Sequence, residues 1–322
     1  MPDTFHYGFR IVGPCSGERK LIDWHVAFAA YATCEERAHV EREAYLSAFT
    51  FGEGFRAHLA AIGSTRGYDG PCFTPWIWFD LDRDAGTRDI DAGLNDARTL
   101  CIQLGQRFAV EDDGLLVFYS GSKGFHVGMP TAGLASIPAA SPSLNFHRIA
   151  RCFAENIAAA AGVTIDTGVY DKVRPVRAPN SRHGKTGRHK RRLTVDELLH
   201  LSAARIIELA KGPEPFDLPT RHTSGSELSA AWNEAADQVR RQTEAQVDRR
   251  AAIVNGKVPA TLNRLTLDFI RTGAAQGDRH RVLFSAAANL GEFGCPPPAG
   301  SCAADGNGTR QWSASIRSPA TD

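Results

Sequence analysis

The stretch from Trp76 to Asp84 constrains the fold more than any other part of the chain. Two tryptophans, an isoleucine and a phenylalanine in a short run after Pro75 predict a buried strand that ends at Asp80 and Asp82. Residues two apart on a strand point to the same face, so the two carboxylates lie close together. Carboxylates this close repel each other unless a cation lies between them, and Mg²⁺ is a common cation in such sites. The alternative is a strand end whose acids are solvated.

Composition excludes several classes of protein. The 322 residues are 43% apolar with a net charge of +1, which predicts an ordinary globular chain of two domains, or one large domain with an appendage. No apolar run approaches the roughly 18 residues of a membrane span, and the N-terminal residues lack a signal-peptide pattern, so we expect a cytoplasmic protein with no membrane partner. The seven cysteines include no C-x-x-C pair, which predicts reduced thiols and gives no support for structural zinc.

Hydrophobic spacing predicts the other elements of the first 212 residues. Helices are expected over 26–48, 90–108 and 142–161, and further buried strands over 115–119 and 163–166. Thr194 and Glu197 have the spacing of a capping box and predict the start of another helix. Strands and helices are therefore interleaved along this part of the chain.

The composition changes near residue 212. Residues 212–226 are rich in Pro, Gly, Ser and Thr, and the charged, Ala-rich stretch over 227–252 predicts a solvent-facing helical connector. Apolar residues return from about Pro259, with an Ala-rich helix expected over 285–290. We therefore expect a domain over 1–212, a linker with a helical connector over 213–256, and a small helical module over 257–322.

Three predicted strands end in polar groups that share one chemistry. The side chains are Asp80 and Asp82 after the first strand, Ser120, Lys123 and His126 on a glycine-rich turn after the second, and Asp166 after the third. Polar groups that meet at strand ends define a site. Three carboxylates can hold the two divalent cations of an in-line phosphoryl transfer. The glycines of the turn let backbone N–H groups approach a phosphate closely.

A basic segment follows the third strand. Residues 172–192 hold nine Lys or Arg and no acid, which is the pattern of a local polyanion-binding surface in a near-neutral protein. Arg177 and His183 are candidates for contacts with a triphosphate. The end of the segment supplies the candidate DNA contacts Arg188, Lys190, Arg191 and Arg192. A solvated basic loop is the alternative interpretation.

The order of these motifs resembles the archaeo-eukaryotic primase superfamily. The residues that carry the resemblance, within about 40–195, are Asp80-Leu81-Asp82, Ser120 to His126, Ile165-Asp166 and Arg177 to Gly187. The resemblance implies an α+β fold with an RRM-like primase catalytic core, a mixed sheet with flanking helices. It implies template-directed nucleotide polymerisation, with Asp80, Asp82 and Asp166 as catalytic ligands of two Mg²⁺ or Mn²⁺ ions. It also implies a triphosphate grip made by Ser120, Lys123, His126, Arg177 and His183.

The C-terminal stretch is similar to the small helical module that follows primase domains of phage and plasmid proteins. The expected function is thus a DNA primase-polymerase, a nucleotidyltransferase whose partners are a single-stranded DNA template, nucleoside triphosphates and a replicative helicase. Two alternatives stay open. One is a gap-filling repair polymerase of the end-joining type. The other is a non-catalytic protein that binds single-stranded DNA or a replication origin.

Overall fold

The computed structural model describes residues 5–82, 90–134, 137, 140–219, 225–255, 261–273 and 285–289. The chain divides into two compact units, Met1–Thr243 and Glu244–Asp322, and each is described by itself. The first unit is a mixed α+β structure with two four-stranded antiparallel sheets and flanking helices. The predicted boundaries at 212 and 256 stay predictions. No helix within these described ranges combines the length and the apolarity needed to cross a bilayer.

The first sheet has the strand order β2-β1-β3-β7. Its strands are β1 (Tyr7–Val12), β2 (Lys20–Asp23), β3 (Ala44–Ser47) and β7 (Pro175–Arg177). Phe9 and Ile11 alternate along β1 and are fully buried, as expected for a sheet with one face on the core. Helices α1 (Trp24–Ala32) and α2 (Glu53–Ile62) accompany this sheet, and the Asp23 carboxylate caps α1 by accepting from the Val26 N–H.

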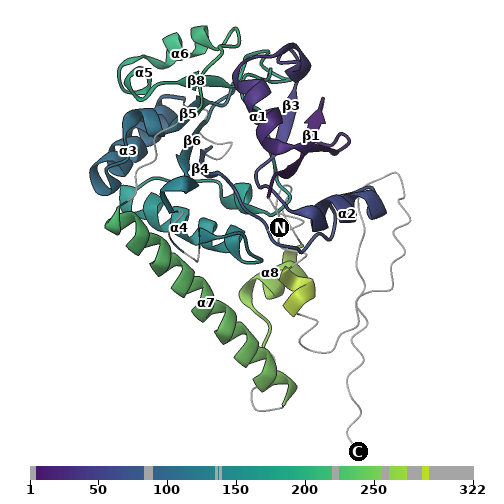
Figure 1. The fold of residues 1–322 in the computed structure, drawn as a ribbon. Helices are drawn as coiled ribbons and strands as arrows, with labels where there is room; N and C mark the ends of the chain where they lie inside the picture. The colour runs from purple at the N-terminus through teal and green to yellow at the C-terminus, as the bar shows by residue number, and fades with distance from the viewer. Residues whose placement is uncertain are drawn as a thin grey trace, which may run out of the picture. The chain divides into compact units, whose positions relative to one another are not determined.

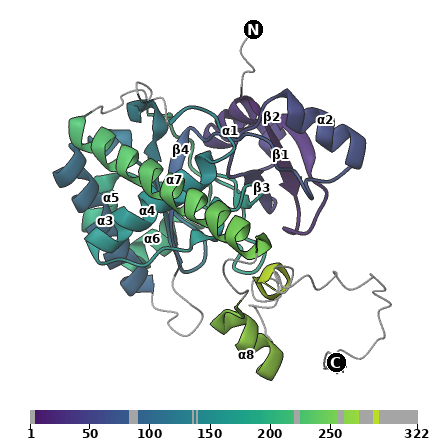
Figure 2. The same cartoon turned by 90° about the horizontal axis from the view of Figure 1, so that it is seen from below.

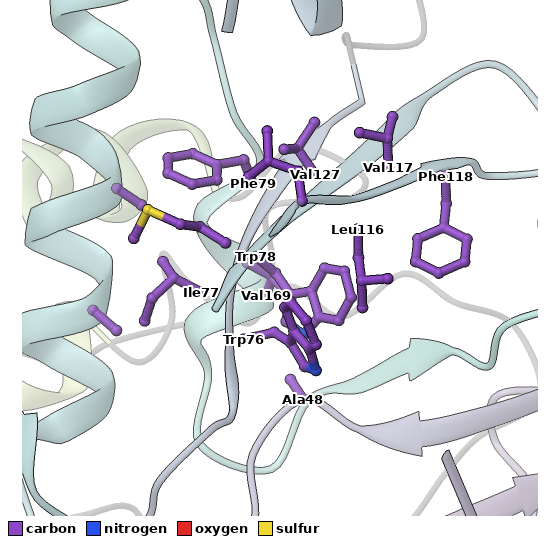
Figure 3. Packing of buried hydrophobic residues seen from close by; sticks show 14 of the residues in the cluster. Ala48, Trp76, Ile77, Trp78, Phe79, Leu116, Val117, Phe118, Val127 and Val169 are labelled. Atoms are coloured by element: carbon purple, nitrogen blue, oxygen red, sulfur yellow. The ribbon is translucent and has the colours of Figure 1, made fainter. Parts of the chain in front are cut away.

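The second sheet has the order β4-β6-β5-β8. Its strands are β4 (Trp76–Leu81), β5 (Leu116–Tyr119), β6 (Phe125–Pro130) and β8 (Arg191–Leu193). Figure 3 shows Ile77 and Phe79 on one side of β4 and Trp76 and Trp78 on the other, which confirms the strand buried on both faces. β4 lies at the sheet edge, and its outer carbonyl groups accept from the Asp166 N–H and the Tyr170 hydroxyl. These contacts cover an edge that would otherwise be unpaired.

Helices cover the face of the second sheet that points away from the first sheet (Figure 1). They are α3 (Ile90–Phe108) and α4 (Phe146–Ala161), with α5 (Val195–His200) and α6 (Ala203–Leu209) beside them. Short 3₁₀ turns are η1 (Glu36–Ala38), η2 (Asp112–Gly114), η3 (Thr131–Leu134) and η5 (Thr167–Tyr170). The helix predicted over 90–108, the strand predicted over 115–119 and the capping box of Thr194 with Glu197 are confirmed.

Three predicted elements differ from the structure. The helix expected over 26–48 ends at Ala32, because residues 44–47 pair with β1 and β7 as strand β3. The helix expected from residue 142 begins at Phe146, because Ser143 exchanges two backbone hydrogen bonds with Cys72. Residues 163–166 form no regular strand, since the chain turns into η5 directly after Asp166. In the first two cases a contact with a distant segment overrides the local pattern.

Helix α7 (Ser226–Val254) is more than the predicted solvent-facing connector. In its first half Leu228, Trp232, Ala235 and Val239 form a buried stripe at helical spacing. Figure 2 shows α7 running across α4, where the Trp232 ring meets the rings of Phe146 and Phe153 at centroid distances of 5.5 and 5.2 Å. This half of α7 therefore belongs to the core of the first unit.

The second unit contains helix α8 (Arg264–Thr272) and a helical segment over 285–289, where an Ala-rich helix was predicted. The Asn263 carboxamide caps α8 by accepting from the Thr266 N–H. Asn289 holds the chain before α8, accepting from the Asn263 N–H and donating to the Thr261 carbonyl. Much of the predicted module over 257–322, including Arg279, His280 and Arg281, lies outside the described residues.

We expect Trp232→Ala to lower the free energy of unfolding by about 3–5 kcal/mol, because it leaves a large cavity against Phe146 and Phe153. Val247→Ala on the same helix is the control, since that side chain is largely exposed and its truncation should change stability by less than about 0.5 kcal/mol. The measurement is urea unfolding followed by circular dichroism. Similar losses in the two variants would contradict the packing of α7 on α4.

Candidate active site

A cavity of about 440 Å³ lies where the end of β4, the turn between β5 and β6, and strands β3 and β7 come together. Its lining includes seven residues that the sequence predicted, namely Asp80, Asp82, Ser120, Lys123, His126, Arg177 and His183. It also includes Glu43, Tyr45, Ser122, Arg174 and Lys185. Three motifs that are far apart in the sequence therefore meet at one cavity.

The acidic wall comes from the end of β4. Asp80 stands opposite His126 in the β4–β6 pairing, and Asp82 follows on the same face. The Asp80 Oδ1 atom is buried and lies 3.4 Å from His126 Nε2, without the alignment of a hydrogen bond. The Asp82 carboxylate lies 3.1 Å from Lys123 Nζ and is more exposed. Asp80 is thus the acid that the fold leaves least satisfied.

Electrostatics at Asp80 disfavours its charged form. Burial, followed by the negative charges of Asp166 and Asp82, raises the pKa of Asp80 to about 7. Burial, together with the positive charges of Lys190 and Arg177, holds the pKa of His126 well below its ordinary value. His126 is therefore neutral near pH 7 and supplies no counter-charge to Asp80. A divalent cation would supply that charge.

Asp166 lies beside the acidic pair and outside the cavity lining. Its backbone N–H donates to the Asp80 carbonyl at 2.7 Å, and its Oδ1 atom accepts from the Gly168 N–H at 2.8 Å. Within the described ranges, no three His, Cys, Asp or Glu side chains are arranged as a complete metal-binding group. The residues still fit Mg²⁺ or Mn²⁺, which commonly take one or two carboxylates together with phosphate and water oxygens. The buried, unpaired Asp80 Oδ1 is the observation that favours such an ion.

The glycine-rich turn positions Ser120. The Ser120 hydroxyl oxygen accepts from the N–H groups of Ser122 and Gly124, at 3.4 and 3.2 Å, so its hydrogen can be donated to a ligand. Gly121 has a φ of +84°, and a Cβ there would lie 3.2 Å from the carbonyl oxygens of Arg188 and His189. Glycine is therefore required both for the backbone conformation and for close contact with the basic segment.

The basic segment is fastened to this turn. The Thr186 hydroxyl donates to the Gly121 carbonyl at 2.6 Å. His183 Nδ1 accepts from the N–H groups of Lys185 and Thr186, at 3.1 and 3.3 Å, which places the proton of the neutral ring on Nε2. Burial and the nearby Arg177 lower the pKa of His183, so the neutral ring prevails. His183 can thus donate from Nε2 to an anion.

The guanidinium of Arg177, at the end of β7, is positioned by contacts with Tyr45 and Glu43. Its guanidinium donates to the Tyr45 hydroxyl at 3.2 Å, lies 3.4 Å from the Glu43 carboxylate, and stacks over the Tyr45 ring at 4.9 Å. The Lys190 ammonium donates to the Arg177 carbonyl at 2.9 Å. An arginine fixed in this way loses little further entropy when it binds a phosphate.

The four predicted DNA contacts do not share one surface. Lys190 is 1% exposed and lies over the rings of Trp78 and Phe118, and burial lowers its pKa to about 7. Arg191 pairs with Glu214 at 2.9 Å, and Arg192 donates to the Leu115 carbonyl at 2.8 Å. Lys190 and Arg191 are buried and leave little surface for a DNA contact, while the assignment of the four residues to DNA stays a prediction. Arg188 and Arg192 are only partly buried.

Sequence reasoning missed Glu43, Tyr45 and Arg174 as lining residues. Glu43 directly precedes β3 and Tyr45 lies within it, in the stretch that was predicted as helix. An alternating acid and aromatic before a short apolar run is the signal that would have found them. Arg174 was counted within the basic segment but was not singled out.

No family model and no curated protein matches this sequence. Among solved structures, the chain can be superposed on the polymerase domain of Ligase D from Mycobacterium tuberculosis, in complex with DNA. The TM-score is 0.32 with 17% sequence identity, over 62% of this chain and 60% of that chain. An overlap of this extent assigns neither fold nor activity, so both are inferred from this chain's own residues.

We expect Asp80→Asn to raise the melting temperature by about 5 °C at pH 8 in metal-free buffer. The folded-state pKa of Asp80, about 7, lies above the ordinary 3.8, so wild-type stability falls as the pH rises between these values and stays lowered above pH 7. The variant lacks this penalty, and its advantage should vanish toward pH 4. Adding Mn²⁺ at pH 8 should raise the melting temperature of the wild type but not of the variant.

Asp196→Asn is the control, because that carboxylate is exposed on α5 and its loss should change neither the pH dependence nor the Mn²⁺ response. The measurement is differential scanning fluorimetry from pH 4 to pH 8. A variant that is no more stable than the wild type at pH 8, or that still responds to Mn²⁺, would remove the metal assignment.

For the basic segment, we expect Arg191→Ala to lower stability by about 1–3 kcal/mol through loss of its bond to Glu214. It should leave the salt dependence of DNA binding unchanged. Arg188→Ala should do the opposite and flatten the log–log salt slope by about one. Thermal melts and binding of a labelled single-stranded oligonucleotide at several salt concentrations measure both. A flatter slope in Arg191→Ala would restore it as a DNA contact.

Proposed function

We propose that the protein is a DNA primase-polymerase, an enzyme that joins nucleotides on a DNA template by nucleotidyl transfer with two Mg²⁺ or Mn²⁺ ions. The observation that supports the proposal is that acidic and cationic side chains line opposite parts of the cavity. Asp80 and Asp82 form one wall, while Arg174, Arg177, His183 and Lys185 supply donors from the other side. A metal–triphosphate complex has the same division, with cations at one end and phosphate oxygens along its length.

The size of the cavity suits a nucleotide. Its volume of about 440 Å³ falls within the range of roughly 300–1,000 Å³ that small-molecule sites occupy. The Ser120 hydroxyl and the His183 Nε2–H are directed donors, and Arg177 offers a planar guanidinium for two phosphate oxygens. Together they would hold and orient the triphosphate against the acids.

The bound metal ions would activate the attacking hydroxyl and balance the charge that develops on the phosphate oxygens. Asp80 and Asp82 would hold these ions. Asp166 would support them from beside the strand, since it is close enough to raise the pKa of Asp80. The neutral His126 would donate to a phosphate oxygen through Nε2 when metal occupies Asp80.

The rest of the chain fits the same function. Single-stranded DNA is the proposed template partner, and residues 257–322 are the proposed module that assists priming or docks a helicase. The catalytic domain is assigned to 1–212, with 213–256 as the linker. Burial of Trp232 extends its core beyond this boundary into α7.

Two other functions compete with priming. A gap-filling repair polymerase would use the same residues and differ only in needing an annealed primer. A non-catalytic DNA-binding protein would not need a buried acid whose charge is disfavoured by two neighbouring carboxylates, because that arrangement destabilises the fold without contributing to DNA binding. The chemistry of Asp80 therefore favours an enzyme.

We expect the pure protein to make labelled oligomers on unprimed single-stranded DNA with nucleoside triphosphates and Mn²⁺. Asp82→Asn should reduce this synthesis by more than about a hundredfold while the protein stays folded and still binds DNA, because the acid holds metal. Gel electrophoresis of the products, with Asp196→Asn as the matched control, is the measurement. Extension of annealed primers alone would favour the repair polymerase. DNA binding without any product would favour the non-catalytic protein.

A further inference from the structure

One acidic residue of the cavity, Glu43, lies among the proposed phosphate-binding residues and not with the proposed metal ligands. Glu43, directly before β3, lines the cavity among the cationic residues Arg177, His183 and Lys185. A phosphate repels a carboxylate, so Glu43 cannot assist directly in holding a triphosphate. The parts of a nucleotide that a carboxylate can bind are its hydrogen-bond donors, which are the hydroxyl groups of the sugar and the amino groups of the base.

The Glu43 carboxylate is oriented, and one of its oxygens is committed. Oε1 accepts from the Tyr45 hydroxyl at 2.5 Å and lies 3.4 Å from Arg177. Burial, followed by the bond to Glu43, raises the pKa of Tyr45 to about 12, so the phenol stays protonated and keeps donating. Side chains of Glu43 and Arg177 are 23% and 12% exposed, which limits competition from water. The orientation is therefore fixed before any ligand binds.

The second oxygen, Oε2, lies against Gly184, where an added Cβ would approach it to 2.4 Å, so only glycine fits beside this carboxylate. Among the described residues Oε2 accepts no hydrogen bond, in contrast to Oε1. An oriented carboxylate that lines the cavity and has one uncommitted oxygen meets the requirement for recognition of a hydroxyl group.

The position of Glu43 selects the sugar rather than the base. Its carboxylate is directly beside Arg177, the guanidinium proposed to hold the phosphates. In a nucleoside triphosphate the sugar follows immediately on the phosphates, and the base lies beyond it. Acidic side chains bind ribose hydroxyls in the same way in dinucleotide sites, next to a separate phosphate-binding element.

We propose that Glu43, positioned by Tyr45, accepts a hydrogen bond from a sugar hydroxyl of the incoming nucleotide and so ranks ribonucleoside triphosphates above analogues that lack it. This inference rests on the proposed function and adds how the site recognises the sugar of the nucleotide. Glu43 is the specificity-determining residue, and Tyr45 is a positioning residue. Arg177 serves both parts, because it holds the phosphates and neutralises Glu43 when no nucleotide is bound.

The test is displacement of a fluorescent ATP analogue by ATP, 2′-deoxy-ATP and 3′-deoxy-ATP, with Mg²⁺ and without DNA. We expect wild-type protein to bind ATP about tenfold more tightly than at least one of the deoxy compounds, as for a hydrogen bond to a charged group. Glu43→Ala should bring that ratio to about one. The compound that shows the preference identifies the hydroxyl, and either identity supports the proposal.

Two further variants separate recognition from folding. Glu43→Gln keeps an acceptor and the shape of the side chain but removes the charge, so it should stay folded and lower the ratio in part. Glu41→Gln is the matched control, because that carboxylate is exposed and contacts only His39 among the described residues, and the wild-type ratio should persist.

A purely structural role for Glu43 would weaken all three nucleotides equally and leave the ratio unchanged in Glu43→Ala, which would overturn the proposal. Equal affinity of the wild type for the three compounds would do the same while leaving the proposed function intact. Failure of the wild type to bind any of the three would overturn the proposed function together with this inference.

Discussion

The rest of the site depends on the placement of a negative charge at the buried end of β4. Asp80 lies between the charges of Asp82 and Asp166, and its Oδ1 atom has no hydrogen-bond partner in the described part of the chain. The fold tolerates this because β4 is fixed on both edges, by β6 on one side and by Asp166 and Tyr170 on the other. A strand held so firmly can keep an unfavourable charge in position until a cation binds.

A buried lysine that contacts both sheets, Lys190, provides a positive charge near Asp80. Lys190 enters from the segment before β8, packs on Trp78 in the second sheet, and donates to the Arg177 carbonyl in the first. Its buried ammonium also lies close enough to Asp80 to lower the pKa of that acid, against the stronger effect of burial. Lys190 thus couples the acidic wall to the cationic wall without lining the cavity. Lys190, which the sequence assigned to DNA, thus contacts both sheets in the interior.

Local patterns predicted the elements that local forces determine. The strand from Trp76 to Leu81, the helix over 90–108 and the Thr194 cap each have a signal in the nearby sequence. Seven residues that the sequence motifs predicted as site residues line one cavity. Long-range pairing decided the rest. Strand β3 forms because β1 and β7 pair with it, and Arg191 is buried where β8 joins β5. Neither partner can be read from residues nearby in the sequence.

The same reasoning explains why the metal- and phosphate-binding residues could be predicted from sequence motifs, whereas Glu43 could not. Metal and phosphate chemistry needs acids and glycines at strand ends, and such residues leave short motifs. Selection of a sugar needs only an oriented acceptor, and Glu43 becomes one because β3 pairs with β7 and brings Tyr45 beside Arg177. That register places Tyr45 directly opposite Arg177, so a slip of one residue would turn one of them away from the cavity. The proposed selection of the sugar therefore depends on the register of β3 and β7, which cannot be predicted from a short sequence motif.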